Sequence, residues 1–348
     1  MIGPPPSVPP SPPRRPLLAL LAALLLPLGA CNETELAYGD VNSIIVGASP
    51  AVWERVGDTL DAALEPTITT TMANEEVFQV SHHSPLDSSW VNLRKFRQLL
   101  LVGTPDDPWV ETALARSDAG SVSPPALVRA YDVWARGQTA TVLVLPSEDD
   151  VEPVVERLPE LRESYLERYR EWALNRMFIT GRDTALADTL ARDFGFRMVV
   201  PDVYQWEVRG DSVVILRNDN PDPAELIRQF TVTWTSPPPD SVSVAELLEW
   251  RGELARAHYE PAHQVDTTLM SVDTVSLDGR EARRIQAIWK NPPEANWPAA
   301  GNFIIQTVEC PADGRMYFVD AWLYAPGKDK FEYLFQLETI LDTFRCAG

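Results

Sequence analysis

The segment from His258 to His263 (His-Tyr-Glu-Pro-Ala-His) contains two of the four histidines in the chain, with a carboxylate between them. Imidazole and carboxylate groups are ligands for zinc, and a helix presents two such histidines to one ion when they are four residues apart. Pro261 excludes a continuous helix here, so only a loop could gather His258, Glu260 and His263 around a metal. The alternative, which we favour, is a pair of ordinary surface or helix-capping histidines.

Short motifs of known chemistry are absent from the sequence. It has no Gly-rich phosphate loop, no G-x-S-x-G, no C-x-x-C and no H-E-x-x-H. Its carboxylates are too numerous for any pair to stand out as a general acid and base. We therefore predict no cofactor and no catalytic residue, and favour a non-enzymatic binding or envelope-assembly module. The alternative is a metal-dependent or other hydrolase that uses His258, His263 and nearby carboxylates.

Cys31 ends a segment with the layout of a bacterial lipoprotein signal. Arg14 and Arg15 precede an apolar run at 17–26, and Leu28-Gly29-Ala30-Cys31 is similar to a lipobox, in which the cysteine is acylated and becomes the new N-terminus. The apolar run is well below the ~20 residues that cross a bilayer. We predict a signal peptide over 1–30 and lipidation of Cys31, the alternative being an ordinary signal followed by an incidental cysteine.

An acyl group on Cys31 would anchor the protein to a membrane without spanning it. Residues 31–40 would then form a tether, and Asn32, in place of an aspartate, favours the outer over the inner membrane of a bacterial envelope. The expected partners are membrane lipid, through acylated Cys31, and an unknown envelope ligand or protein.

The two remaining cysteines, Cys310 and Cys346, are predicted to form a disulfide, as an even pair favours in an oxidising compartment. A hairpin turn at Asp313-Gly314 leads into a predicted strand at 315–324, which spans roughly 33 Å. A predicted helix at 328–344 returns roughly 25 Å, so it brings Cys346 back towards Cys310. The alternative is two buried free thiols.

Aromatic residues are concentrated in the last predicted strand. Met316, Phe318, Trp322 and Tyr324 share one face of it with Asp320. Aromatic side chains beside an acid can line a groove for a sugar or a peptide. More often they are the second face of a buried strand, which is the interpretation we favour.

Predicted strands outnumber predicted helices and often occur as hairpins, which indicates an α+β fold of layered, largely antiparallel sheets with packed helices. The length of the chain favours two α+β subdomains, 41–180 and 181–348.

The composition of the chain excludes two classes of protein. Hydrophobic residues make up 45% of the 348 residues, a fraction too high for a disordered chain. Loss of 1–30 removes two arginines and no acid, so the net charge changes from −20 to −22. An acidic chain without a basic cluster is not expected to bind nucleic acid.

Several stretches recur together in one bacterial lipoprotein family: the lipobox, Ile44-Ile45-Val46 followed by Trp53, and the stretches 78–82, 96–100 and 324–330. The chain resembles this family, domain of unknown function 4837, over nearly its whole mature length. Where the family has Arg-Asn and Arg-Asp, this chain has Arg97-Gln98 and Arg251-Gly252. The family has no established activity or catalytic residues, so the resemblance implies an envelope location but no function.

Overall fold

The computed structural model describes residues 3, 34–65, 67–69, 74–277 and 279–347. The predicted lipidation site Cys31 and, apart from Gly3, the predicted signal peptide lie outside these residues. In the part that is described, no helix has both the length and the apolar composition needed to cross a membrane. The elements below all belong to one unit, residues 36–348.

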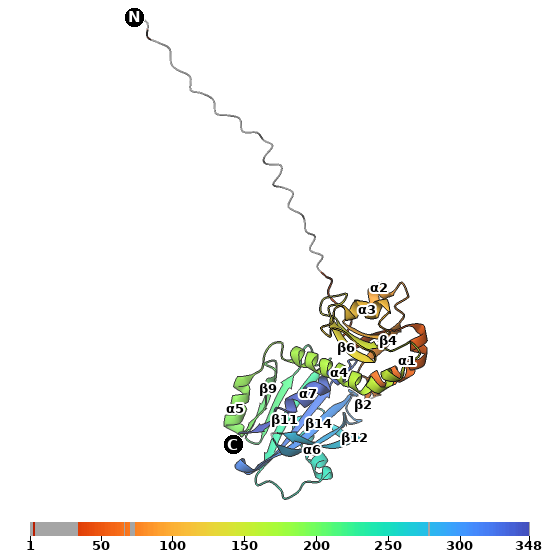
Figure 1. The fold of residues 1–348 in the computed structure, drawn as a ribbon. Coiled ribbons are helices and arrows are strands. Elements are labelled where there is room, and N and C mark those ends of the chain that lie inside the picture. Colours follow the sequence, from red (N-terminus) through yellow and green to blue (C-terminus); the bar gives the residue numbers. More distant parts are fainter. Residues whose placement is uncertain (1–2, 4–33, 66, 70–73, 278, 348) are drawn as a thin grey trace. The chain divides into compact units, whose positions relative to one another are not determined.

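The first sheet has the strand order β4-β1-β5-β7-β6. Figure 1 labels its two outer strands, β4 and β6. Its strands are β1 (Ser43–Gly47), β4 (Gln79–His83), β5 (Gln98–Gly103), β6 (Ala126–Tyr131) and β7 (Thr139–Val144). All neighbours pair in parallel except β6, which is antiparallel to β7. The α+β class is confirmed, but this sheet is mainly parallel rather than antiparallel. Strands β5 and β7 are buried on both faces, as expected for the central strands of a sheet that helices cover on both sides.

Helices supply those covering layers. They are α1 (Pro50–Leu64), α2 (Trp90–Leu93), α3 (Pro108–Leu114) and α4 (Glu152–Met177). Helix α1 begins where Ser49 accepts a hydrogen bond from the backbone N–H of Val52, as the Ser-Pro pair predicts. Apolar residues of α1 and α4 share one core cluster, and those of α2 and α3 share another. A separate two-stranded sheet contains β2 (Thr67–Thr69) and β3 (Asn74–Glu76).

The second sheet is antiparallel throughout and has the order β12-β13-β14-β15-β11-β10-β9. Its strands are β9 (Gln205–Arg209), β10 (Val213–Asn218), β11 (Ile227–Thr235), β12 (Gln264–Leu277), β13 (Arg280–Lys290), β14 (Ala300–Cys310) and β15 (Arg315–Tyr324). The predicted turn at Gly314 is present and connects β14 to β15 through the short 3₁₀-helix η2 (Pro311–Asp313), with Gly314 at a φ of +60°. Such a conformation favours glycine.

Helices lie on both faces of the second sheet. On one face, apolar residues of α5 (Thr184–Phe194) and α7 (Phe331–Leu341) pack with those of the sheet in one core cluster. On the opposite face, apolar residues of α6 (Val244–His258) pack with the sheet in another core cluster. Ser243 caps α6, because its hydroxyl accepts from the N–H of Glu246 while the Glu246 carboxylate accepts from the N–H of Ser243.

The chain ends beside the start of β15. Strand β16 (Arg345–Cys346) pairs with β8 (Phe196–Arg197), and a disulfide joins Cys346 to Cys310 at the end of β14. The Cα atoms of the two cysteines are 5.7 Å apart. This is the pairing that the lengths of the predicted strand and returning helix indicate, since α7 runs back along the sheet to the hairpin end.

Candidate functional site

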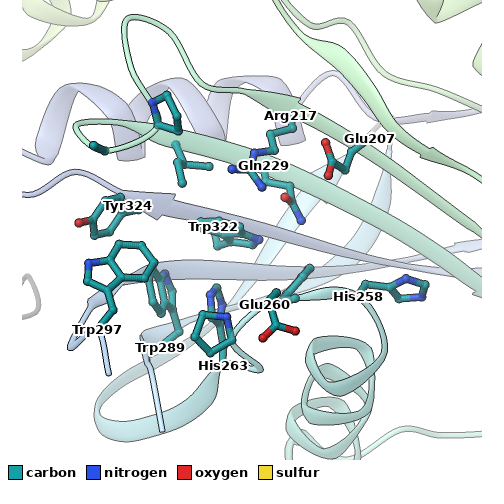
Figure 2. Close-up of a pocket in the computed structure, with 15 residues that line it drawn as sticks. Glu207, Arg217, Gln229, His258, Glu260, His263, Trp289, Trp297, Trp322 and Tyr324 are labelled. Atoms are coloured by element: carbon teal, nitrogen blue, oxygen red, sulfur yellow. The ribbon is translucent and has the colours of Figure 1, made fainter. Parts of the chain in front are cut away.

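A pocket of about 390 Å³ lies on the α6 side of the second sheet, a volume typical of small-molecule sites (Figure 2). Strands β9, β10, β11, β13 and β15 contribute to its walls, as do the C-terminal end of α6 and the loops after β10, α6 and β13. The lining residues are Glu207, Arg217, Pro223, Ala224, Ile227, Gln229, His258, Tyr259, Glu260, Pro261, His263, Trp289, Trp297, Trp322 and Tyr324.

The sheet register explains why residues far apart in sequence meet here. Tyr324 is paired with Ile227, and Trp322 with Gln229, which is itself paired with Arg217 on the next strand. Cross-strand partners point to the same face of a sheet. A row of side chains therefore runs from the aromatic residues of β15 to the polar residues of β11 and β10.

Trp289 fits against the sheet because its neighbour is a glycine. A Cβ atom on Gly301 would lie 2.6 Å from the indole Nε1 of Trp289 and 1.9 Å from the carbonyl oxygen of Leu323. Without that atom, the indole Nε1 donates a hydrogen bond of 3.0 Å to the Leu323 carbonyl. Trp289 is thereby fully buried and held in a fixed orientation at the edge of the pocket.

His263 continues this aromatic packing. Its ring stacks on Trp289 with the centroids 3.9 Å apart and meets Trp322 nearly edge-on at 4.9 Å. Burial, with a smaller contribution from the nearby Arg251 guanidinium, lowers the pKa of His263 to about 2. The imidazole is therefore neutral at physiological pH and belongs to the wall of the pocket rather than to a titrating pair.

A buried ionic network lies below the pocket. Arg251 on α6 and Asp320 on β15 are both fully buried, and the arginine Nε is 3.0 Å from an Asp320 oxygen. The Tyr259 hydroxyl donates to the other Asp320 oxygen at 2.7 Å and lies 2.8 Å from Oγ1 of Thr231. Burial and the Asp320 carboxylate raise the pKa of Tyr259 well above its ordinary value, so the phenol stays protonated. This network fixes the end of α6 to the sheet.

Charged side chains line the pocket on the other side of Trp322 from Trp297 and Tyr324. Figure 2 shows Glu207, Arg217 and Glu260 on the side opposite Trp289, Trp297 and Tyr324. Arg217 forms an ion pair with Asp219 at 2.7 Å.

The carboxylates of Glu207 and Glu260 are exposed, and neither makes a hydrogen bond or ion pair with another described residue. Both are therefore open to a ligand.

The three candidate metal ligands line this pocket without forming a metal site. His258 points away from Glu260 and His263 in Figure 2. Within the described ranges, no group of three His, Cys, Asp or Glu side chains is placed to hold one ion. The physical reason is that Pro261 ends the helical geometry and His263 turns inward to stack on Trp289.

The aromatic face of β15 combines both alternatives that the sequence left open. Met316, Phe318 and Asp320 are buried, as expected for the inner face of a strand. Trp322 and Tyr324, at the C-terminal end of the same face, line the pocket. Asp320 does not reach a groove, because Arg251 and Tyr259 occupy its oxygens.

Other pocket residues had no sequence signal. Glu207, Arg217 and Gln229 come from strands whose order in the sheet is not encoded locally. The structural role of Arg251 was also missed, although a charged residue at the apolar spacing of an amphipathic helix is a usable indication of a buried ion pair.

Two protein families match different parts of the chain. Residues 183–343 match the family described as Domain of unknown function (DUF4837), and residues 37–178 match the one described as Domain of unknown function (DUF8532). The resemblance to the first family is thus confirmed for the C-terminal match. It does not extend to the stretches at 44–46, 78–82 and 96–100, which lie in the second match. No curated protein matches the sequence.

Solved structures give weak similarities. A mutant of the protein Mog1 and the Saccharomyces cerevisiae Ran-binding protein Mog1p each have a TM-score of 0.29 and 9% identity, and the alignments cover 44% of this chain and 92% and 91% of theirs. Cyanobacterial PsbP (CyanoP) from Synechocystis sp. PCC 6803 has a TM-score of 0.28 and 14% identity, over 44% of this chain and 86% of that protein.

Proposed function

We propose that this protein is a lipid-anchored binding protein of the bacterial envelope, tethered through Cys31, whose second sheet holds a small organic ligand in the pocket beside Trp322. The observation that carries the binding function is the combination of a ligand-sized cavity, buried aromatic walls and unpaired carboxylates. The motif Leu28-Gly29-Ala30-Cys31 after a short apolar run supports the anchor. Envelope assembly would be one use of such binding.

Binding has more support than the hydrolase alternative. Neutral, stacked His263 already uses its ring for packing, and His258 points away from it. The Glu260 carboxylate is exposed and makes no ion pair with another residue that the structure describes. The pocket residues are therefore better suited to contact a ligand than to transfer its protons.

A thermal-shift screen of small molecules tests the binding function. A ligand at one hundred times its Kd adds about 2.7 kcal/mol of stability, or a Tm increase of several degrees. The same compound should have a smaller effect on Trp297→Ala, whose side chain is 45% exposed and is not needed for the core. If every compound that stabilises the protein acts equally on this variant, the pocket is not the binding site.

The anchor has an independent test. We expect the wild-type protein, expressed with its signal in bacteria, to incorporate radiolabelled palmitate and to partition with membranes. Cys31→Ser should lose the label and become extractable without detergent. Label that persists in this variant would contradict lipidation at Cys31.

A further inference from the structure

We propose that the pocket takes an organic cation, a quaternary or alkylated ammonium group, that lies beside Trp322, between the other aromatic rings and the carboxylates of Glu207 and Glu260, which counter its charge. This inference rests on the proposed function, since it names the ligand class of the same site. It follows from the angles between the rings, the charge at the site and the exposure of the rings.

The aromatic side chains form walls at steep angles to one another. Trp289 and Trp322 are 5.6 Å apart at 74°, and Trp297 and Tyr324 are 5.2 Å apart at 73°. Trp322, Trp297 and Tyr324 can in this way present electron-rich surfaces to one alkylated ammonium group, while Trp289, which is covered by the His263 ring, supports Trp322 from behind.

The balance of charge in the pocket is negative. Arg217, the one arginine or lysine among the lining residues, is neutralised by Asp219. Arg251 and Asp320 below the pocket neutralise each other, and the His263 imidazole is uncharged. Two unpaired carboxylates remain, Glu207 and Glu260, in a chain whose net charge of −20 already attracts cations over a distance.

The exposure of the rings argues against a neutral sugar. Stacking of a sugar requires a broad aromatic face open to solvent. Of the four rings only Trp297, at 45%, is well exposed, whereas Trp289, Trp322 and Tyr324 are each below 10%. A compact ammonium group needs less open surface than a sugar ring.

Isothermal titration calorimetry with a matched pair of probes tests the inference. Choline carries a trimethylammonium group, and 3,3-dimethyl-1-butanol has the same shape with a neutral carbon in place of nitrogen. We expect choline to bind with a Kd below about 10 mM and at least about tenfold more tightly than the alcohol. The affinity for choline should fall as salt is added, because the carboxylates are exposed.

Variants locate the interaction. Trp297→Ala and the double change Glu207→Gln with Glu260→Gln should each weaken choline binding about fivefold or more. Matched controls are Trp206→Ala and Glu253→Gln, which remove an exposed indole and an exposed carboxylate outside the pocket, and they should leave the affinity unchanged. Circular dichroism confirms that the variants are folded.

The outcomes separate this inference from the proposed function. Equal affinity for choline and its neutral analogue, no choline binding at all, or full binding by the double glutamine variant would overturn the cation inference. A neutral compound that stabilises the wild-type protein but not Trp297→Ala would leave the binding function intact. Equal effects of all stabilising compounds on both proteins would contradict the binding function as well.

Discussion

The indole of Trp289 lies across Gly301, with its Nε1 only 2.6 Å from the position that a Cβ atom would take there. Gly301→Ala should therefore displace the indole, break its hydrogen bond to Leu323 and destabilise the protein by about 3 kcal/mol. Urea unfolding measures the loss, and ligand titration should show a weakened pocket.

The control for this substitution is Gly252→Ala. Gly252 is in α6, and the nearest atom to its added Cβ is the flexible end of Arg256 at 3.5 Å. Alanine has the higher helix propensity, so this variant should gain up to about 1 kcal/mol. If Gly301→Ala were as stable as the wild type, Trp289 would not depend on the glycine for its position.

The buried pair of Arg251 and Asp320 predicts a large effect of removing one charge. Asp320→Asn should destabilise the protein by about 3 kcal/mol, because the Arg251 guanidinium then stays buried without its counterion. The control Glu160→Gln breaks the exposed ion pair with Arg157 and should change stability by less than about 0.5 kcal/mol. If denaturant titrations show the same small loss in the free energy of unfolding for both variants, the buried ion pair contributes no more to stability than the exposed one.

His263 predicts a pH dependence of stability with a definite sign. Its pKa is about 2 in the folded protein and near the ordinary 6.5 when unfolded, so the unfolded state binds the proton first as the pH falls. Its contribution to stability is complete above pH 6.5 and decreases by up to about 1.4 kcal/mol for each pH unit below it.

The variant His263→Phe keeps an aromatic ring on Trp289 but does not titrate. The wild type should therefore lose stability relative to this variant between about pH 6 and pH 4. Acidic groups such as Glu338, whose pKa burial raises, are present in both proteins and cancel in the difference. A difference that is constant with pH would contradict a buried, neutral His263.

The disulfide predicts a stability effect that follows from loop length. Cys310 and Cys346 are 36 positions apart in the sequence. On the chain-entropy model, a disulfide that closes a loop of this size stabilises the folded protein by roughly 4 kcal/mol. Cys346→Ser should lower the free energy of unfolding by about 2–5 kcal/mol, as is typical when a native disulfide is removed. Reducing agent should have little further effect on the variant. Two free thiols in the unfolded, unreduced wild type would contradict the bridge.

Local signals allowed part of the fold to be predicted. Serine is a favoured N-cap residue, so Ser243 marks the start of α6, and the turn at Asp313-Gly314 separates β14 from β15. Each depends on a few neighbouring residues whose hydrogen bonds or backbone angles have one favourable arrangement. The disulfide followed from the same elements, because strand and helix lengths set where Cys346 returns.

The pocket could not be predicted in the same way. Gln229 and Trp322 are adjacent only because β11 pairs with β15, a pairing over almost one hundred residues that leaves no local pattern. The mainly parallel first sheet was also missed, since an apolar run such as that of β5 fits buried strands of either direction. Asp320 shared the predicted aromatic face, but its pairing with Arg251 depends on how α6 packs.

The most direct measurement is fluorine NMR of protein in which the 11 tryptophans carry 5-fluorotryptophan, each resonance assigned by a single Trp→Phe change. We predict that choline shifts the resonances of Trp289, Trp297 and Trp322 and leaves those of Trp53 and Trp109 in place, because only the first three line the pocket. Shifts confined to tryptophans outside the pocket, or none at saturating choline, would contradict an organic-cation site on the second sheet.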